Sequence, residues 1–148
     1  MKIGIFDTPP QKWFPFDKDT EVLIQHIEKA KLNTILMQGA EAAKKMKAKA
    51  GSVQDIFLGK AAVFGWRKIT DQDQPGMLLP NGDPLPFTPE NRNLAITKSN
   101  RFSEFVYRIA TDETQFIDDD IPELDADDLK DLEDVLAEFS KEEQPGNE

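Results

Sequence analysis

Residues 12–27 read KWFPFDKDTEVLIQHI, and this stretch decides the fold class. Two short apolar runs stand on either side of the charged segment Asp17-Lys18-Asp19. Apolar and aromatic runs separated by a polar turn are typical of a β-hairpin. Upstream, Ile3 to Phe6 forms another short apolar run before Pro9 and Pro10, so we expect a small N-terminal hairpin or meander.

Downstream of this stretch the hydrophobic spacing changes to that of helices. From Glu28 onward, apolar residues recur three and four positions apart, which predicts a long helix weakened at Gly39. Gly51 is a natural stop for this helix. A second helix is expected from near Val53 to about Gly65.

Residues 66–87 are rich in Pro and Gly, which predicts a loop or an irregular hairpin that turns at Asn81-Gly82. A helix should start directly afterwards. Thr88 can cap it, Pro89 has the backbone angle of a first helical position, and Glu90 favours the positive end of the helix dipole. The cleanest amphipathic stripe follows, from Phe102 to Ala110.

The formal net charge of −10 is concentrated at one end of the chain. Residues 118–148, named here the acidic tail, contain 14 acidic residues and two lysines, a balance of −12. Residues 1–117 contain 14 acidic and 16 basic residues, a balance of +2. We therefore predict an α+β domain over 1–117, a hairpin or meander packed with about four helices, followed by a largely flexible acidic tail.

The acidic tail contains one amphipathic segment, near 126–140, which predicts a short helix. Its apolar side is formed by Leu129, Leu132, Leu136 and Phe139. A helix this short is marginal by itself. Two interpretations stay open: it folds back on its own domain, or it is a partner-binding segment that docks in a groove of another protein.

The residue inventory argues against an enzyme. The chain has no cysteine, which excludes disulfides, thiolate metal sites and Cys nucleophiles and fits a reducing cytoplasm. The single histidine, His26, lies on the apolar face of a predicted strand, so a structural role is expected. No phosphate loop, nucleophile elbow, zinc motif or ordered calcium loop is present, so we expect no metal and no cofactor.

The chain also lacks the apolar run of a signal peptide and any stretch near the roughly 20 apolar residues of a membrane span. We expect a cytoplasmic protein with no membrane partner. A short basic cluster, Lys44, Lys45, Lys47 and Lys49, has three interpretations: a solvated helix end, a weak nucleic-acid footprint, or a docking place for the acidic tail. Because the protein is acidic, nucleic acid is not the expected partner.

The segment from Phe64 to Asn91 resembles the tail assembly chaperones of long-tailed bacteriophages and prophages. The resemblance rests on a Trp, a turn around Gly, a Pro-hydrophobic-Pro-Phe step and a Thr-Pro-Glu-Asn helix start. These structural-motif residues are Trp66, Gly82, Pro86, Phe87, Thr88, Pro89, Glu90 and Asn91. The resemblance covers about residues 12–116. The loop after Trp66 is longer than in the family, and the segment 102–110 is more aromatic.

The resemblance implies a non-enzymatic chaperone in the host bacterial cytoplasm. Such a protein binds the tape-measure protein during tail assembly, keeps its long hydrophobic helices soluble and helps to recruit tail-tube subunits. A different interpretation comes from the charge alone. The acidic tail could occupy a basic surface of a nucleic-acid-binding protein and act as an inhibitor or regulator.

Overall fold

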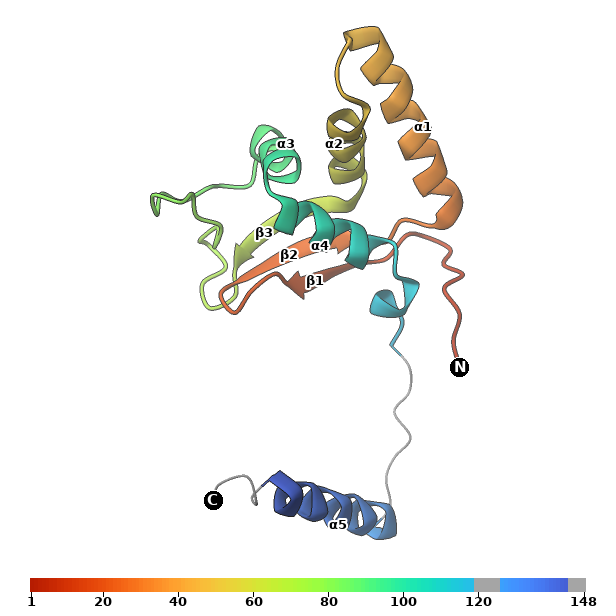
Figure 1. Ribbon diagram of the computed structural model, residues 1–148, viewed down its shortest axis with the longest axis vertical. Coiled ribbons are helices and arrows are strands. Elements are labelled where there is room, and N and C mark those ends of the chain that lie inside the picture. The colour runs from red at the N-terminus through yellow and green to blue at the C-terminus, as the bar shows by residue number, and fades with distance from the viewer. Residues whose placement is uncertain (119–125, 144–148) are drawn as a thin grey trace. The chain divides into compact units, whose positions relative to one another are not determined.

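The chain divides into two compact units, Met1–Ile117 and Asp118–Glu148, and the computed structural model describes residues 1–118 and 126–143. The first unit holds a three-stranded antiparallel sheet, four α-helices and one 3-10 helix (Figure 1). The predicted α+β class is therefore confirmed. We call this unit the α+β domain.

The sheet begins with the expected hairpin. β1 (Gln11–Pro15) pairs antiparallel with β2 (Thr20–Gln25), with Phe14 opposite Val22. The turn is held by the Asp17 carboxylate, whose Oδ1 accepts hydrogen bonds from the backbone N–H groups of Asp19 and Thr20, both at 2.8 Å. The short polar side chain at the turn therefore replaces backbone partners that the strands cannot supply.

The third strand is β3 (Val63–Lys68), which pairs antiparallel with the free edge of β2. We expected a helix up to about Gly65, so this part of the prediction is wrong, as is the extended run Ile3–Phe6, which forms no strand. Residues 63–68 form a strand because of a tertiary interaction. The edge of β2 carries unpaired backbone groups, and residues 63–68 satisfy them while burying Val63 and Trp66.

A helical hairpin connects β2 to β3. α1 (Lys29–Met46) is followed by Lys47, whose left-handed backbone (φ 54°) turns the chain into α2 (Ala50–Ala62). α2 starts three residues earlier than expected and contains Gly51, so the predicted helix stop at Gly51 is wrong. Gly39 lies where the helices cross, because a Cβ added there would come within 2.8 Å of the Gln54 Cα. Gly39 is thus a site of close helix approach, which the spacing alone did not reveal.

Two further helices meet at Ser99. α3 (Pro89–Lys98) starts as predicted, since the Thr88 Oγ1 accepts a hydrogen bond from the Asn91 N–H at 3.0 Å. α4 (Asn100–Ala110) is capped by Ser99, whose Oγ accepts from the Phe102 N–H at 3.1 Å. The predicted Thr88 cap is confirmed. A short 3-10 helix, η1 (Glu113–Phe116), ends the domain.

The hydrophobic core lies between the sheet and the helices. α4 crosses the sheet and contacts β2, while α2 contacts β2 and β3 (Figure 1). Aromatic rings join the layers edge to face: Trp66 lies 5.8 Å from Phe102, and Phe14 lies 5.2 Å from Phe116. η1 is therefore part of the core, because Phe116 is buried with it.

The second unit contains α5 (Ala126–Glu143), a helix of 18 residues. It includes the segment 126–140 that the sequence analysis singled out. Its sequence carries eight acidic residues and two lysines.

Candidate functional site

The α+β domain carries an apolar groove of about 450 Å³ between the loop after β3 and the α3–α4 corner. Its lining is apolar except for Lys98 and Ser99. The lining passes from buried Phe102, through half-buried Phe16, to well-exposed Leu78 (63% exposed) and Leu94 (45%). These two leucines are exposed beside an apolar hollow, an arrangement that is typical of interaction sites.

The loop that forms one wall of the groove is held by hydrogen bonds. The Leu85 N–H donates to the Met77 carbonyl at 2.9 Å, and the Leu79 N–H donates to the Asp83 carbonyl at 2.8 Å. Gly82 has φ +92°, which suits the predicted turn at this position. The wall is therefore a defined irregular hairpin, despite containing no regular strand.

Trp66 ties this loop to the sheet. It is 4% exposed, and its Nε1–H donates to the Leu85 carbonyl at 2.8 Å. The Phe87 ring lies edge-on to the indole, with the centroids 4.9 Å apart. Trp66 and Phe87 thus support the groove from within, and neither lines it.

The remaining structural-motif residues fix the start of α3, which forms the opposite wall. Pro89 takes a first-turn position, Glu90 lies exposed in that turn, and the Asn91 side-chain amide donates to the Pro86 carbonyl at 2.9 Å. These residues orient α3 and, through it, Leu94. The motif identified in the sequence is therefore a scaffold for the groove rather than its surface.

Sequence reasoning missed the groove residues themselves. Met77, Leu78 and Leu79 form an apolar run, followed by Pro80, inside a loop rich in Pro and Gly. That run was a usable signal, because no predicted helix or strand was present to bury it. Leu94 was assigned to a helix, and only the structure shows that it lies beside the loop.

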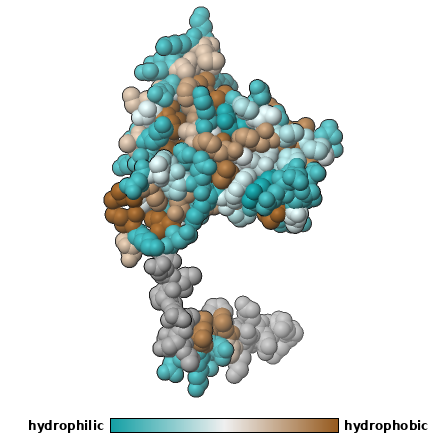
Figure 2. All heavy atoms as spheres, turned by 180° about the vertical axis from the view of Figure 1, so that it is seen from behind, coloured by the Kyte–Doolittle hydropathy of each residue, from teal (hydrophilic) through white to brown (hydrophobic). Residues whose placement is uncertain are grey.

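The predicted partner-binding residues belong to α5. Leu129, Leu132 and Leu136 are all exposed, and so is Val135, which the sequence analysis did not name. The side chain of Phe139 lies outside the described part of the chain. Figure 2 shows apolar side chains of α5 open to solvent beside hydrophilic ones. An amphipathic helix is thus present with its apolar stripe uncovered within its own unit.

His26 has a structural position. Its side chain is buried, and its Nδ1 lies 2.8 Å from the Ala110 carbonyl. Because a carbonyl only accepts, Nδ1 must carry the proton in this contact. The ring lies between Phe6 and Phe116, with centroid distances of 5.4 Å and 5.1 Å. His26 therefore links β2 to the end of α4.

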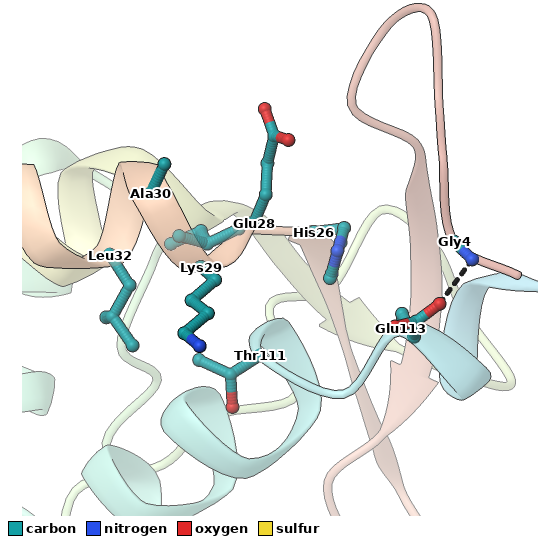
Figure 3. Close-up of a pocket in the computed structure, with 9 residues that line it drawn as sticks. Gly4, His26, Glu28, Lys29, Ala30, Leu32, Thr111 and Glu113 are labelled. Atoms are coloured by element: carbon teal, nitrogen blue, oxygen red, sulfur yellow. Dashed lines mark hydrogen bonds between the residues drawn. The ribbon is translucent and has the colours of Figure 1, made fainter.

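A second hollow, also of about 450 Å³, opens at the start of α1 (Figure 3). His26, Lys29 and Thr111 lie around it together with two carboxylates, Glu28 and Glu113. Glu113 is already engaged, since it accepts a hydrogen bond from the Gly4 N–H. Thr111 donates its hydroxyl to the Tyr107 carbonyl at 2.7 Å, so it is not oriented as a nucleophile toward His26.

Two carboxyl groups have shifted pKa values. Burial raises the pKa of Asp55, whereas hydrogen bonds from the side chains of Thr114 and Gln115 lower the pKa of Asp112. The Asp112 contact with the Thr114 hydroxyl (2.6 Å) is local to η1. Asp112 therefore acts as the N-cap of η1, where its Oδ1 also accepts a hydrogen bond from the Thr114 N–H at 3.1 Å.

Over residues 1–118 and 126–143, no group of three or more His, Asp or Glu side chains is placed to hold a metal ion. Within those same ranges, no helix combines the length and the apolar character needed to cross a bilayer. The four clustered lysines, Lys44, Lys45, Lys47 and Lys49, lie exposed at the connection between α1 and α2.

No family model, curated protein or solved structure matches this chain.

Proposed function

We propose that this protein is a non-enzymatic tail assembly chaperone of a bacteriophage or prophage, which binds the tape-measure protein in the host cytoplasm and helps tail-tube assembly. The observation that carries the proposal is the apolar groove. Leu78 and Leu94 stay exposed at its edge, above the buried ring of Phe102. An apolar hollow of this kind supports the binding of an apolar client segment without any chemical step.

The groove is suited to reversible holding of a client. Its apolar area is removed from water only when a client side chain enters, so the hydrophobic effect supplies the binding energy. The scaffold beneath it, from Trp66 to the Thr88 cap, keeps the walls in place in the absence of a client. Such preorganisation lowers the entropy lost on binding.

α5 supports the same proposal as a second contact. Its leucine stripe can lie against an apolar client segment, as amphipathic helices do in grooves. The −12 balance of the acidic tail adds solubility and mutual repulsion to the complexes. Both properties suit a protein that keeps a hydrophobic client dispersed.

Co-expression with the tape-measure protein and the tail-tube subunit tests the proposal. We expect the full-length chain to capture the tape-measure protein and the Leu78→Asp/Leu94→Asp variant to lose most of that capture. Met37→Asp is the matched control, because Met37 is an exposed apolar residue on α1, outside the groove. Failure of the unmodified chain to capture either tail protein would contradict the proposed function.

An acidic inhibitor of a nucleic-acid-binding protein is the second candidate. The observation that favours it is the excess of eight acidic residues over two lysines in α5. Binding through such charges weakens steeply with salt, whereas apolar binding shows a negative heat-capacity change and modest salt dependence. Calorimetry of the captured complex at two salt concentrations therefore separates the two candidates.

A further inference from the structure

We propose that the apolar groove accepts an amphipathic helix whose apolar stripe is flanked by carboxylates. This inference rests on the proposed function, because it names the kind of client segment that the groove selects. It follows from three properties of the groove: the state of its backbone groups, its volume and the charge at its α3–α4 end.

The backbone of the loop wall favours a helix over an extended segment. The N–H groups of Leu79, Gly82 and Leu85 are all bonded within the loop. Pro80 and Pro84 have no N–H to donate. Between Leu79 and Leu85 the wall therefore offers no row of free N–H donors for strand addition. A helix needs none, since it satisfies its own backbone.

The volume of the groove sets how many side chains enter. At about 450 Å³ it is within the usual range of ligand sites. A cavity of roughly 150 Å³ accepts one benzene molecule, so the groove has space for about three apolar side chains. Three side chains at positions i, i+3 or i+4, and i+7 lie on one face of a helix. The groove thus matches about two turns of an amphipathic helix.

The charge at the α3–α4 end selects the flanks of that helix. Lys98 is the one charged residue that lines the groove, and no acidic residue does. Arg101 contacts Phe16, which lines the groove. Its guanidinium carbon lies 4.5 Å from the centroid of the Phe16 ring, and its Nη2–H donates to the Phe16 carbonyl at 3.4 Å. Neither cation forms an ion pair with an acid of the described residues. Carboxylates beside the apolar stripe of a client would form ion pairs with Lys98 and Arg101, and lysines there would be repelled.

Synthetic peptides test this inference with the full-length protein. One peptide of roughly 18 residues carries three leucines at helical spacing flanked by glutamates. Its partners replace the glutamates by lysines or place a proline at the centre. Lysines on a peptide are also attracted to the −12 acidic tail, so the quantity compared is the ratio of glutamate-peptide affinity to lysine-peptide affinity. We expect this ratio to be about five-fold higher for the unmodified chain than for the Lys98→Glu/Arg101→Glu variant, as two exposed ion pairs allow.

The acidic tail is present in both proteins, so the fall in this ratio isolates the two groove cations. Leu94→Asp should weaken all the peptides, which places them in the groove, and a thermal transition like that of the unmodified chain shows that each variant is folded. An unchanged preference in the double variant, or tight binding of the proline peptide, would overturn the inference. Capture of the tape-measure protein in co-expression would then still support the proposed function, so the two failures are distinguishable.

Discussion

Thr88 starts α3 with a single side-chain oxygen, which accepts the Asn91 N–H at 3.0 Å. We expect Thr88→Ala to lower the free energy of unfolding by about 1 kcal/mol, because an N-terminal N–H loses its partner. Thr97→Ala is the matched control, since the Thr97 hydroxyl bonds back to the Asn93 carbonyl and caps nothing. Urea denaturation measures both, and equal effects at the two positions would contradict the capping role.

Asp112 gives the domain a defined response to acid. Hydrogen bonds from Thr114 and Gln115 lower the pKa of Asp112, so the folded state binds its proton less well than the unfolded state does. The stability from this group is therefore present above its unfolded pKa, near 3.9, and is lost as the pH falls through the lower folded value. Asp112→Asn keeps a capping oxygen but cannot titrate.

The measurement is the difference in unfolding free energy between the unmodified chain and Asp112→Asn as a function of pH. We expect it to be constant above about pH 5 and to shrink below about pH 4. A difference that stays constant down to pH 2 would show that the Asp112 carboxylate makes no charge-dependent contribution.

At the scale of elements, the contact between α1 and α2 depends on Gly39. A Cβ at this position would come within 2.8 Å of the Gln54 Cα and 3.2 Å of its N, and these backbone atoms cannot rotate away. We expect Gly39→Ala to destabilise the domain by about 1–3 kcal/mol, because the helices must separate. The Gln54 Nε2 bond to the Leu36 carbonyl would be strained as well.

Gly51→Ala is the control for this helix pair. An added Cβ at Gly51 meets no atom within 4 Å, and alanine is the better helix former, so we expect a neutral change or a gain of up to about 1 kcal/mol. Thermal or urea unfolding compares the two variants. Equal behaviour would show that the close approach at Gly39 is unimportant for stability.

The elements that could be predicted from the sequence are those with local causes. The β1–β2 hairpin depends on its polar turn, and α3 and α4 depend on Thr88 and Ser99, each of which acts within three residues. β3 could not be predicted in this way. Its residues become a strand because β2 offers an unpaired edge, a fact that no short window of sequence contains.

The groove, too, could be predicted from the sequence only where its parts have local causes. The motif from Trp66 to Asn91 coincides with the scaffold beneath the groove, since turns and caps have sequence signatures. The proposed binding surface includes Leu78 and Leu94, which are distant in sequence and line one groove only when the loop folds beside α3. Exposure of an apolar side chain is a tertiary property. The leucine run near residue 78 therefore indicated an apolar surface but not which element it would lie beside.

For the whole molecule, the hydrophobic core and the net charge are carried by different parts of the chain. Among residues 1–118 and 126–143, every core residue lies between Phe6 and Phe116, whereas residues 118–148 hold the −12 balance. The α+β domain therefore has the apolar contacts for folding without the acidic tail, and its own balance is +2. The tail is then a determinant of solubility and association, as strong net charge usually is.

We accordingly expect a chain of residues 1–117 to unfold cooperatively, with a Tm within about 4 °C of the full-length value, because less than roughly 1 kcal/mol is lost. A chain of residues 1–112 is the control. It removes Phe116, which is 5% exposed and lies edge-on to Phe14, so a loss of about 3–5 kcal/mol is expected. Differential scanning calorimetry measures all three chains. A gradual, uncooperative transition in residues 1–117 would mean that folding of the domain requires the tail, and the separation of core and charge would be wrong.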